Sequence, residues 1–166
     1  MPDQAPAIIF SAHGLPQKIV DAGDPYVRQV EATVAAAAQA IGLVAGSYQI
    51  AYQSRVGPLK WVGPATDETI IAAARAGKPI VVVPVAFVSE HSETLVELDI
   101  EYGHLAKEHG APAYHRAPTV STHPAFIAGL ADLVRKALAS GKELQPGCGR
   151  AACMGQSQCA MTKAGA

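Results

Sequence analysis

The chain has 166 residues, of which 49% are apolar and 16% are charged, and its formal net charge is -1. This length suffices for one compact domain with its own core, and the composition is that of an ordinary globular protein. The near-zero charge leaves no basic surface for nucleic acid, and no apolar run reaches the roughly 18 residues that cross a bilayer. The first residues lack the basic and apolar segments of a secretion signal, so we expect a cytoplasmic location.

Short β-rich runs alternate with helical segments along the chain. The β-rich runs are dense in Val, Ile and Tyr, and several helical segments begin after Asp or Ser and end before Gly. In chain order, the patterns predict a strand at 7–12, a helix at 24–41, a strand at 47–53, a helix at 67–76, a strand at 79–87, a helix at 92–109, a strand at 113–116 and a helix at 123–140.

Strict alternation of strands and helices predicts an α/β fold with a parallel four-stranded sheet and helices on both faces, that is, three αβα layers. The run at 79–87 is apolar on both faces, as a central strand should be, and Pro84 within it predicts a local irregularity. We expect one domain over residues 1–140, followed by a loosely ordered, Cys-containing tail over 141–166.

Ligands of parallel α/β sheets bind beyond the carboxyl ends of the strands. Two polar segments are expected there: residues 11–16, which contain His13, and residues 89–94, which contain His91 and Glu93. Each histidine on its own is explained as a loop hydrogen-bonding group. Together, two histidines and a carboxylate on one edge of the sheet are explained equally well as a functional site and as loop hydrogen-bonding groups.

Three glutamates follow the third strand at helical spacing. Glu93, Glu97 and Glu101 are spaced i, i+4, i+8 and share one helical face, with no Lys or Arg between residues 90 and 101. Repulsion between like charges at this spacing costs roughly 0.2–0.5 kcal/mol per pair. The pattern fits either a solvated acidic face or a track of carboxylates that holds or moves cations and protons.

Three long motifs in this order resemble those of ferrochelatases, which are lyases of haem biosynthesis. The motifs occupy residues 10–16 with 23–26, residues 52–64, and residues 87–95 with 97–102. The resemblance runs from about residue 8 to residue 139 and corresponds to the second of the family's two similar α/β halves. It implies a chelatase-like fold and the insertion of Fe(II) into protoporphyrin IX to form protohaem. Imidazole and carboxylate suit this exchange of two pyrrole protons for one divalent ion.

The resemblance also implies roles for individual residues. His13 and Glu93 match the family's catalytic and metal-binding pair, which face each other across the porphyrin. His91, Glu97 and Glu101 match residues of a proton or metal relay. The positions that match porphyrin-binding residues are Tyr52, Ser54, Arg55 and Trp61. For Trp61, packing within its own domain is an equal alternative.

The three cysteines, Cys148, Cys153 and Cys159, lie in the tail. They loosely resemble the C-terminal ligands of the [2Fe–2S] cluster that many ferrochelatases carry. Such a cluster needs four thiolates, and this chain has three. The resemblance therefore implies a cluster in a full-length enzyme, whereas three free thiols explain the isolated chain.

The sequence is compatible with more than one function. The chain is either an active chelatase for protoporphyrin, coproporphyrin or sirohydrochlorin, or a non-catalytic porphyrin- or haem-binding half-domain. Its expected partners are the porphyrin, ferrous iron, and either the missing N-terminal half or a second copy that completes the cleft. Peripheral contact with a membrane is a further expectation.

Overall fold

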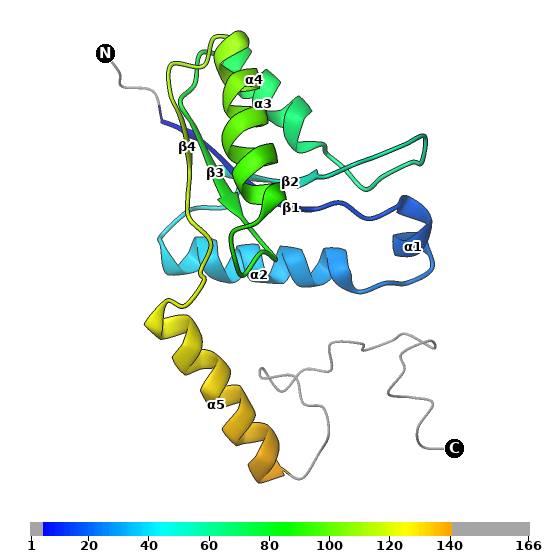
Figure 1. Cartoon of the computed structure of the whole chain (residues 1–166), viewed down its shortest axis with the longest axis vertical. Helices are drawn as coiled ribbons and strands as arrows, with labels where there is room; N and C mark the ends of the chain where they lie inside the picture. The colour runs from blue at the N-terminus through cyan, green and yellow to red at the C-terminus, as the bar shows by residue number, and fades with distance from the viewer. Residues whose placement is uncertain (1–4, 141–166) are drawn as a thin grey trace.

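The computed structural model describes residues 5–140, which form a parallel four-stranded sheet with helices on both faces (Figure 1). The strand order is β2-β1-β3-β4, and every pairing is parallel. The predicted fold class is confirmed. The elements are β1 (Ala7–His13), α1 (Gln17–Asp21), α2 (Tyr26–Ala40), β2 (Tyr48–Gln53), α3 (Thr66–Arg75), β3 (Ile80–Pro84), η1 (Glu93–Glu101), α4 (Tyr102–Glu108), β4 (Tyr114–Arg116) and α5 (Pro124–Ser140).

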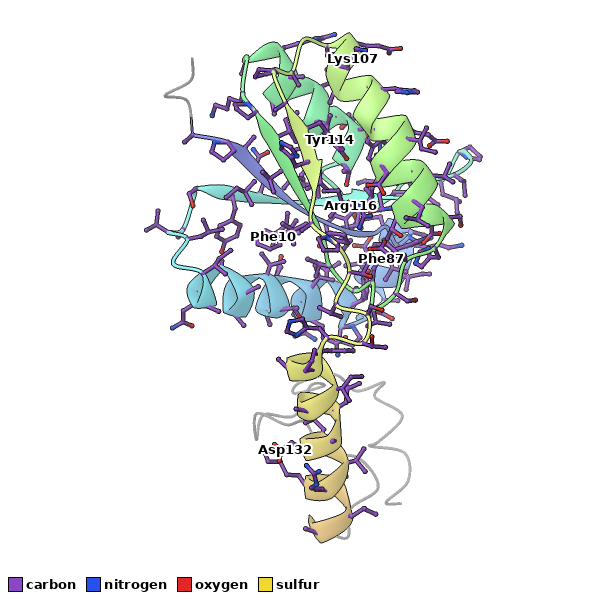
Figure 2. The ribbon with its side chains drawn as sticks, turned by 60° about the vertical axis from the view of Figure 1, so that its left-hand side comes forward. Phe10, Phe87, Lys107, Tyr114, Arg116 and Asp132 are labelled. Atoms are coloured by element: carbon purple, nitrogen blue, oxygen red, sulfur yellow. The ribbon has the colours of Figure 1, made fainter. Side chains whose placement is uncertain are left out.

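The two faces of the sheet carry separate apolar clusters, because successive side chains of a strand point to opposite faces. Ile9 packs with residues of α3, η1 and α4, whereas its neighbour Phe10 packs with Val30 and Val34 of α2. Figure 2 shows Phe10 between the sheet and α2. Fully burying a side chain of this size contributes about 1.5–3 kcal/mol. These contacts fix β1 in the centre of the sheet and its last residue, His13, at the carboxyl edge.

Several element boundaries differ from the sequence-based expectation. The third strand ends at Pro84: the Val85 N–H still donates to Ser11 O, but the positive φ of Ala86, 67°, turns the chain out of the extended conformation. The short helix α1 was not predicted. The helix expected from Asp24 begins at Tyr26, whose N–H donates to Asp24 Oδ1 at 2.8 Å.

The helix predicted over 92–109 consists of two segments with different hydrogen bonding. η1 is a π-helix, in which each backbone N–H bonds to the carbonyl five residues earlier, and α4 continues it as an α-helix. The Tyr102 N–H, for example, donates to Glu97 O. Such segments are rare and are frequently found at functional sites.

α5 leaves the sheet and extends away from the rest of the domain (Figure 1). Its large apolar side chains are exposed to solvent over much of their surface: Ile127, Leu130, Leu133, Val134 and Leu138. Within residues 5–140, no helix combines the length and apolarity needed to cross a membrane. The tail predicted over 141–166 lies outside the described residues, so its boundary with the domain stays a prediction.

Candidate functional site

His13 and Glu93 meet at the carboxyl edge of the sheet. His13 is the last residue of β1 and Glu93 the first of η1, and His13 Nε2 lies 3.3 Å from Glu93 Oε1. The Nδ1 atom of His13 lies 2.7 Å from Gly14 O. Because a carbonyl oxygen accepts only, Nδ1 carries the hydrogen and the Nε2 lone pair of a neutral ring faces the carboxylate. The lone pairs of His13 Nε2 and Glu93 Oε1 therefore face each other, and this arrangement favours a proton or a cation between the two atoms.

The His13–Glu93 pair is open to solvent, so it does not serve mainly to stabilise the fold. The side chains of His13 and Glu93 are 42% and 38% exposed. Exposed ion pairs contribute little to stability. The sequence-predicted juxtaposition of these two residues is therefore present in a place that a ligand can reach.

Glu97 lies one turn further along η1 and is held by four hydrogen bonds. Its Oε1 accepts from the Ser54 N–H at 2.7 Å and from the Tyr102 hydroxyl at 2.8 Å. Its Oε2 accepts from Ser54 Oγ at 2.6 Å and from Gln53 Nε2 at 3.1 Å. Hydrogen bonds to an ionised acceptor are stronger than neutral ones. Glu97 is therefore a fixed negative charge behind Glu93, with little freedom to swing.

Ser54 takes a backbone conformation that non-glycine residues rarely adopt, with a φ of 59°. Both its N–H and its hydroxyl donate to Glu97, so the carboxylate holds the chain in this left-handed turn. Strained backbone of this kind persists where the surroundings over-determine it. Ser54 thus lies at the candidate site, as the sequence predicts.

Tyr102 supports the far side of Glu97. Burial, followed by the nearby charge of Glu97 and the hydrogen bond to it, raises the pKa of Tyr102 well above its ordinary value. The phenol therefore stays protonated and continues to donate to Glu97. Sequence reasoning missed this role, because the tyrosine lies beyond the last predicted glutamate.

The other two predicted relay residues differ from Glu97 in their surroundings. His91 is exposed, its Nδ1 accepts the Glu93 N–H at 3.1 Å, and its ring packs on Phe87 with centroids 5.2 Å apart. It thus helps to begin η1. Glu101, at the end of η1, is exposed. Both remain predicted relay residues.

Trp61 closes the loop after β2 onto the loop after β1. The Val62 N–H donates to Leu15 O at 2.9 Å, and the Gln17 N–H donates to Lys60 O at 2.8 Å. The indole packs over Gly14, and its Nε1 is a buried donor without an acceptor among the described residues. Trp61 therefore combines a packing role with a polar atom that lacks a partner.

Two of the predicted porphyrin-binding residues point elsewhere. Tyr52 is only 3% exposed and belongs to the apolar cluster under α2. Arg55 faces the first turn of α3, where it lies 3.4 Å from Asp67 and 3.9 Å from Glu68. The structure does not bring either side chain to the His13–Glu93 pair.

Arg116, the last residue of β4, ties this strand to η1 (Figure 2). Its Nε and Nη2 donate to the two oxygens of Asp99, at 2.5 and 2.8 Å, and its Nη1 donates to Glu90 at 3.0 Å. Although burial raises the pKa of Glu90, hydrogen bonds from Thr119, Thr94 and Arg116 outweigh it and lower that pKa to about 2. This ionic clamp fixes the segment that precedes Glu93.

Within residues 5–140, no three His, Cys, Asp or Glu side chains gather into a ready-made metal site. The three cysteines proposed as cluster ligands lie outside the described residues. A cavity of about 390 Å³ lies at the opposite edge of the sheet, between the starts of β1 and β2 and helix α3.

Comparison with known proteins agrees with this arrangement. A ferrochelatase of Phenylobacterium zucineum (strain HLK1) is 56% identical over 131 residues, covering 79% of this chain and 38% of the relative. A ferrochelatase of Caulobacter vibrioides (strain NA1000 / CB15N) is 55% identical over 128 residues, covering 77% and 37%, and one of Rickettsia bellii (strain OSU 85-389) is 50% identical over 134 residues, covering 81% and 38%. The chain thus spans less than two fifths of the length of these relatives.

Two further comparisons concern the fold and the family. The solved structure of a CbiX protein, named for cobalamin (vitamin B12) biosynthesis, from Marinobacter aquaeolei VT8 superposes with a TM-score of 0.54 at 20% identity. It covers 82% of this chain and 99% of that protein, which indicates a shared fold. The sequence model of the ferrochelatase family matches residues 1–138. The chain therefore belongs to the ferrochelatase family.

Proposed function

We propose that this chain is the second α/β half of a protoporphyrin ferrochelatase and takes part in inserting Fe(II) into protoporphyrin IX, the last step of protohaem synthesis. The observation that carries the proposal is the solvent-open His13–Glu93 pair, with Nε2 and Oε1 3.3 Å apart, in a chain of this family. Iron and porphyrin are substrates here.

The reaction replaces two pyrrole N–H protons with one divalent cation. His13 Nε2 is the base that accepts a pyrrole proton or holds the incoming metal, since its lone pair is directed away from the Gly14 contact. Glu93 neutralises the cation, and protons leave along the relay of Glu97, Glu101 and His91, in which Glu97 supplies a fixed negative charge. An imidazole–carboxylate site selects poorly among divalent ions, so Zn(II) and Co(II) compete with Fe(II).

The porphyrin lies against the loop after β2. Ser54 and Trp61 are the residues of this group with the best support, because Ser54 contacts the Glu97 carboxylate and Trp61 carries an unpartnered buried N–H beside Gly14. Tyr52 and Arg55 are weaker candidates, because Tyr52 is buried and Arg55 pairs with α3.

The cleft is completed by another body of protein, either the N-terminal half of the family or a second copy of this chain. Two observations support this proposal: the chain spans 38% of its relatives' length, and the apolar side chains of α5 are exposed. Sedimentation of the purified chain, alone and mixed with the N-terminal half of a relative, distinguishes a homodimer from a heterodimer. A strict monomer under both conditions contradicts the proposal.

The deciding experiment measures insertion of Fe(II), and of Zn(II) as a stable substitute, by the chain alone and with the N-terminal half. Protoporphyrin IX, coproporphyrin and sirohydrochlorin are compared as acceptors. We expect protoporphyrin to react fastest and His13→Ala to remove the activity. Equal rates for wild type and His13→Ala contradict the proposed role of the pair.

A second candidate function is binding of porphyrin or haem without turnover. The openness of the pair favours it, because a half-cleft with 42% and 38% exposed groups excludes little water on its own. Tight binding of porphyrin by the chain, with no insertion after the N-terminal half is added, supports this candidate over the enzyme.

The tail adds a separate proposal, that Cys148, Cys153 and Cys159 ligate a [2Fe–2S] cluster in the full-length enzyme. Three thiolates do not satisfy a cluster that takes four ligands, so the fourth must come from elsewhere. Anaerobic iron and sulfide analysis with visible spectroscopy tests it. A colourless, iron-free preparation of the full-length enzyme rejects the cluster.

A cytoplasmic location and peripheral contact with a membrane complete the proposal. Exposed Val56 and Leu59, on the loop after β2, support the membrane contact. Co-sedimentation with lipid vesicles, compared between the wild type and a Val56→Ser/Leu59→Ser variant, tests this contact. Equal binding by the two proteins argues against a role for this loop.

A further inference from the structure

Gln53, the last residue of β2, is a buried amide in the middle of the candidate site. It is 1% exposed, and every polar atom of its side chain has a partner. Its Oε1 accepts from Ser11 Oγ at 2.8 Å. Its Nε2 donates to the backbone carbonyl of Glu93 at 2.8 Å and to Glu97 Oε2 at 3.1 Å.

The hydroxyls behind Gln53 give its hydrogen bonds one direction. Ser11 Oγ also lies 2.8 Å from Thr66 Oγ1, and both residues are fully buried. Because the single hydroxyl hydrogen of Ser11 goes to Gln53, Thr66 must donate to Ser11. The chain of donors therefore runs from Thr66 through Ser11 and Gln53 to Glu97.

The two acceptors beside Nε2 fix the orientation of the amide. Turning it over would place Oε1 against the Glu93 carbonyl and the Glu97 carboxylate, which are both acceptors. A buried polar group left in this state loses its hydrogen bonds without any compensation from water. The amide is thus a rigid link from the core of the sheet to the first turn of η1.

We propose that Gln53 is a positioning residue, which holds the backbone of Glu93 and the carboxylate of Glu97 in the arrangement that metal insertion requires. It acts through these two residues, because its burial keeps it from the substrates. The kinetic consequence rests on the proposed function, whereas the structural consequence does not.

Isosteric variants separate the donors of Gln53 from its volume. Gln53→Met keeps the length and removes both donors, and Gln53→Glu keeps the shape but offers acceptors only. The matched control is Gln49→Met, at an exposed glutamine of the same strand. Ser11→Ala releases Oε1 and serves as a milder variant if the Gln53 variants fold poorly.

The structural readout is hydrogen exchange of the Ser54 amide in the purified 166-residue chain. This amide donates to Glu97 Oε1 and is protected while the carboxylate stays in place. We expect faster exchange in Gln53→Met and Ser11→Ala, and wild-type exchange in Gln49→Met. Unchanged protection in Gln53→Met overturns the positioning role, whether or not the chain inserts metal.

The kinetic readout is the split between kcat and KM for the porphyrin, corrected for the folded fraction. Loss of a hydrogen bond to a charged group predicts a fall in kcat of roughly tenfold for Gln53→Met and Gln53→Glu, with KM unchanged. A merely structural residue lowers the folded fraction and leaves kcat per folded molecule as in the wild type, and that result overturns the proposal. If the wild type inserts no metal at all, the proposed function fails while hydrogen exchange still decides the role of Gln53.

Discussion

His13 Nε2 and Glu93 Oε1 lie 3.3 Å apart, although the two residues belong to different elements, the end of β1 and the start of η1. The parallel topology explains the meeting, since the segments that follow β1 and β3 leave the sheet at the same edge. The exposed imidazole and carboxylate thereby share a space open to a ligand.

Replacing the imidazole should remove the base from this pair. We expect His13→Ala to abolish metal insertion and to leave the free energy of unfolding almost unchanged, because an exposed ion pair contributes little stability. Insertion rates and urea unfolding measure the two effects. His115→Ala, at an exposed histidine of β4, is the control and should retain the wild-type rate.

Neutralising the opposing carboxylate tests the second member of the pair. Glu93→Gln keeps the shape and removes the charge that balances the cation, so insertion should fall severely while porphyrin binding persists. Rates over a range of metal concentrations measure it, with Glu108→Gln on α4 as an exposed control. Activity equal to that of the control would remove Glu93 from the mechanism.

Gly14 should tolerate no side chain. A Cβ at Gly14 would lie 3.0 Å from Gln53 O and 3.3 Å from atoms of Arg55 and Trp61. Crowding of this kind costs about 1–3 kcal/mol, so Gly14→Ala should lower the free energy of unfolding by that amount. Gly129→Ala is the contrasting variant, since nothing lies within 4 Å of its Cβ and helix α5 should gain about 0.5–1 kcal/mol. Equal effects of the two substitutions in urea unfolding would contradict the close packing at Gly14.

Acid should weaken the fold through Glu90. Its pKa is about 2 in the folded chain, below the ordinary value of 4.5, so the folded state favours the ionised form. The resulting stability is fully present above pH 4.5 and is lost as the pH falls toward 2. In Arg116→Met the pKa of Glu90 should lie closer to its ordinary value. The free energy of unfolding should then fall less steeply between neutral pH and about pH 3. Urea unfolding across this range gives the free energy of unfolding against pH for the wild type and for Arg116→Met. Parallel curves for the two proteins would show that the Arg116 clamp does not cause the loss of stability in acid.

Much of the fold follows from local sequence patterns. A continuous apolar run locates β3, because a strand buried on both faces needs such a sequence, and the alternation of Tyr48, Ile50 and Tyr52 locates β2. The short helix α1 escaped prediction, because five residues after a proline carry no helical periodicity. The π-helix also escaped, because glutamates spaced four apart fit an α-helix equally well.

The site was predictable only in part. His13, Glu93 and Glu97 stand out as polar residues next to apolar strands. Ser11 and Gln53 lie within segments that the sequence singles out, but no role is predicted for either, because single polar residues of strands are usually explained by local burial. Their hydrogen bonds join residues 42 and 44 positions apart in the sequence, which no local pattern encodes. Arg116 and Asp99, 17 positions apart, escaped for the same reason.

Because η1 is π-helical, we expect this segment to tolerate neither the insertion nor the deletion of a single residue. Each residue of an ordinary helix advances the chain by about 100°, so deleting one residue here would relax η1 toward α-helical winding and rotate everything on one side of the cut. Two points of η1 are tethered: its first residue, Glu93, by Gln53, and Leu98, within the segment, by the Tyr114 hydroxyl. Length variants of this segment should therefore be far rarer among functional sequences than substitutions of its outward-facing residues.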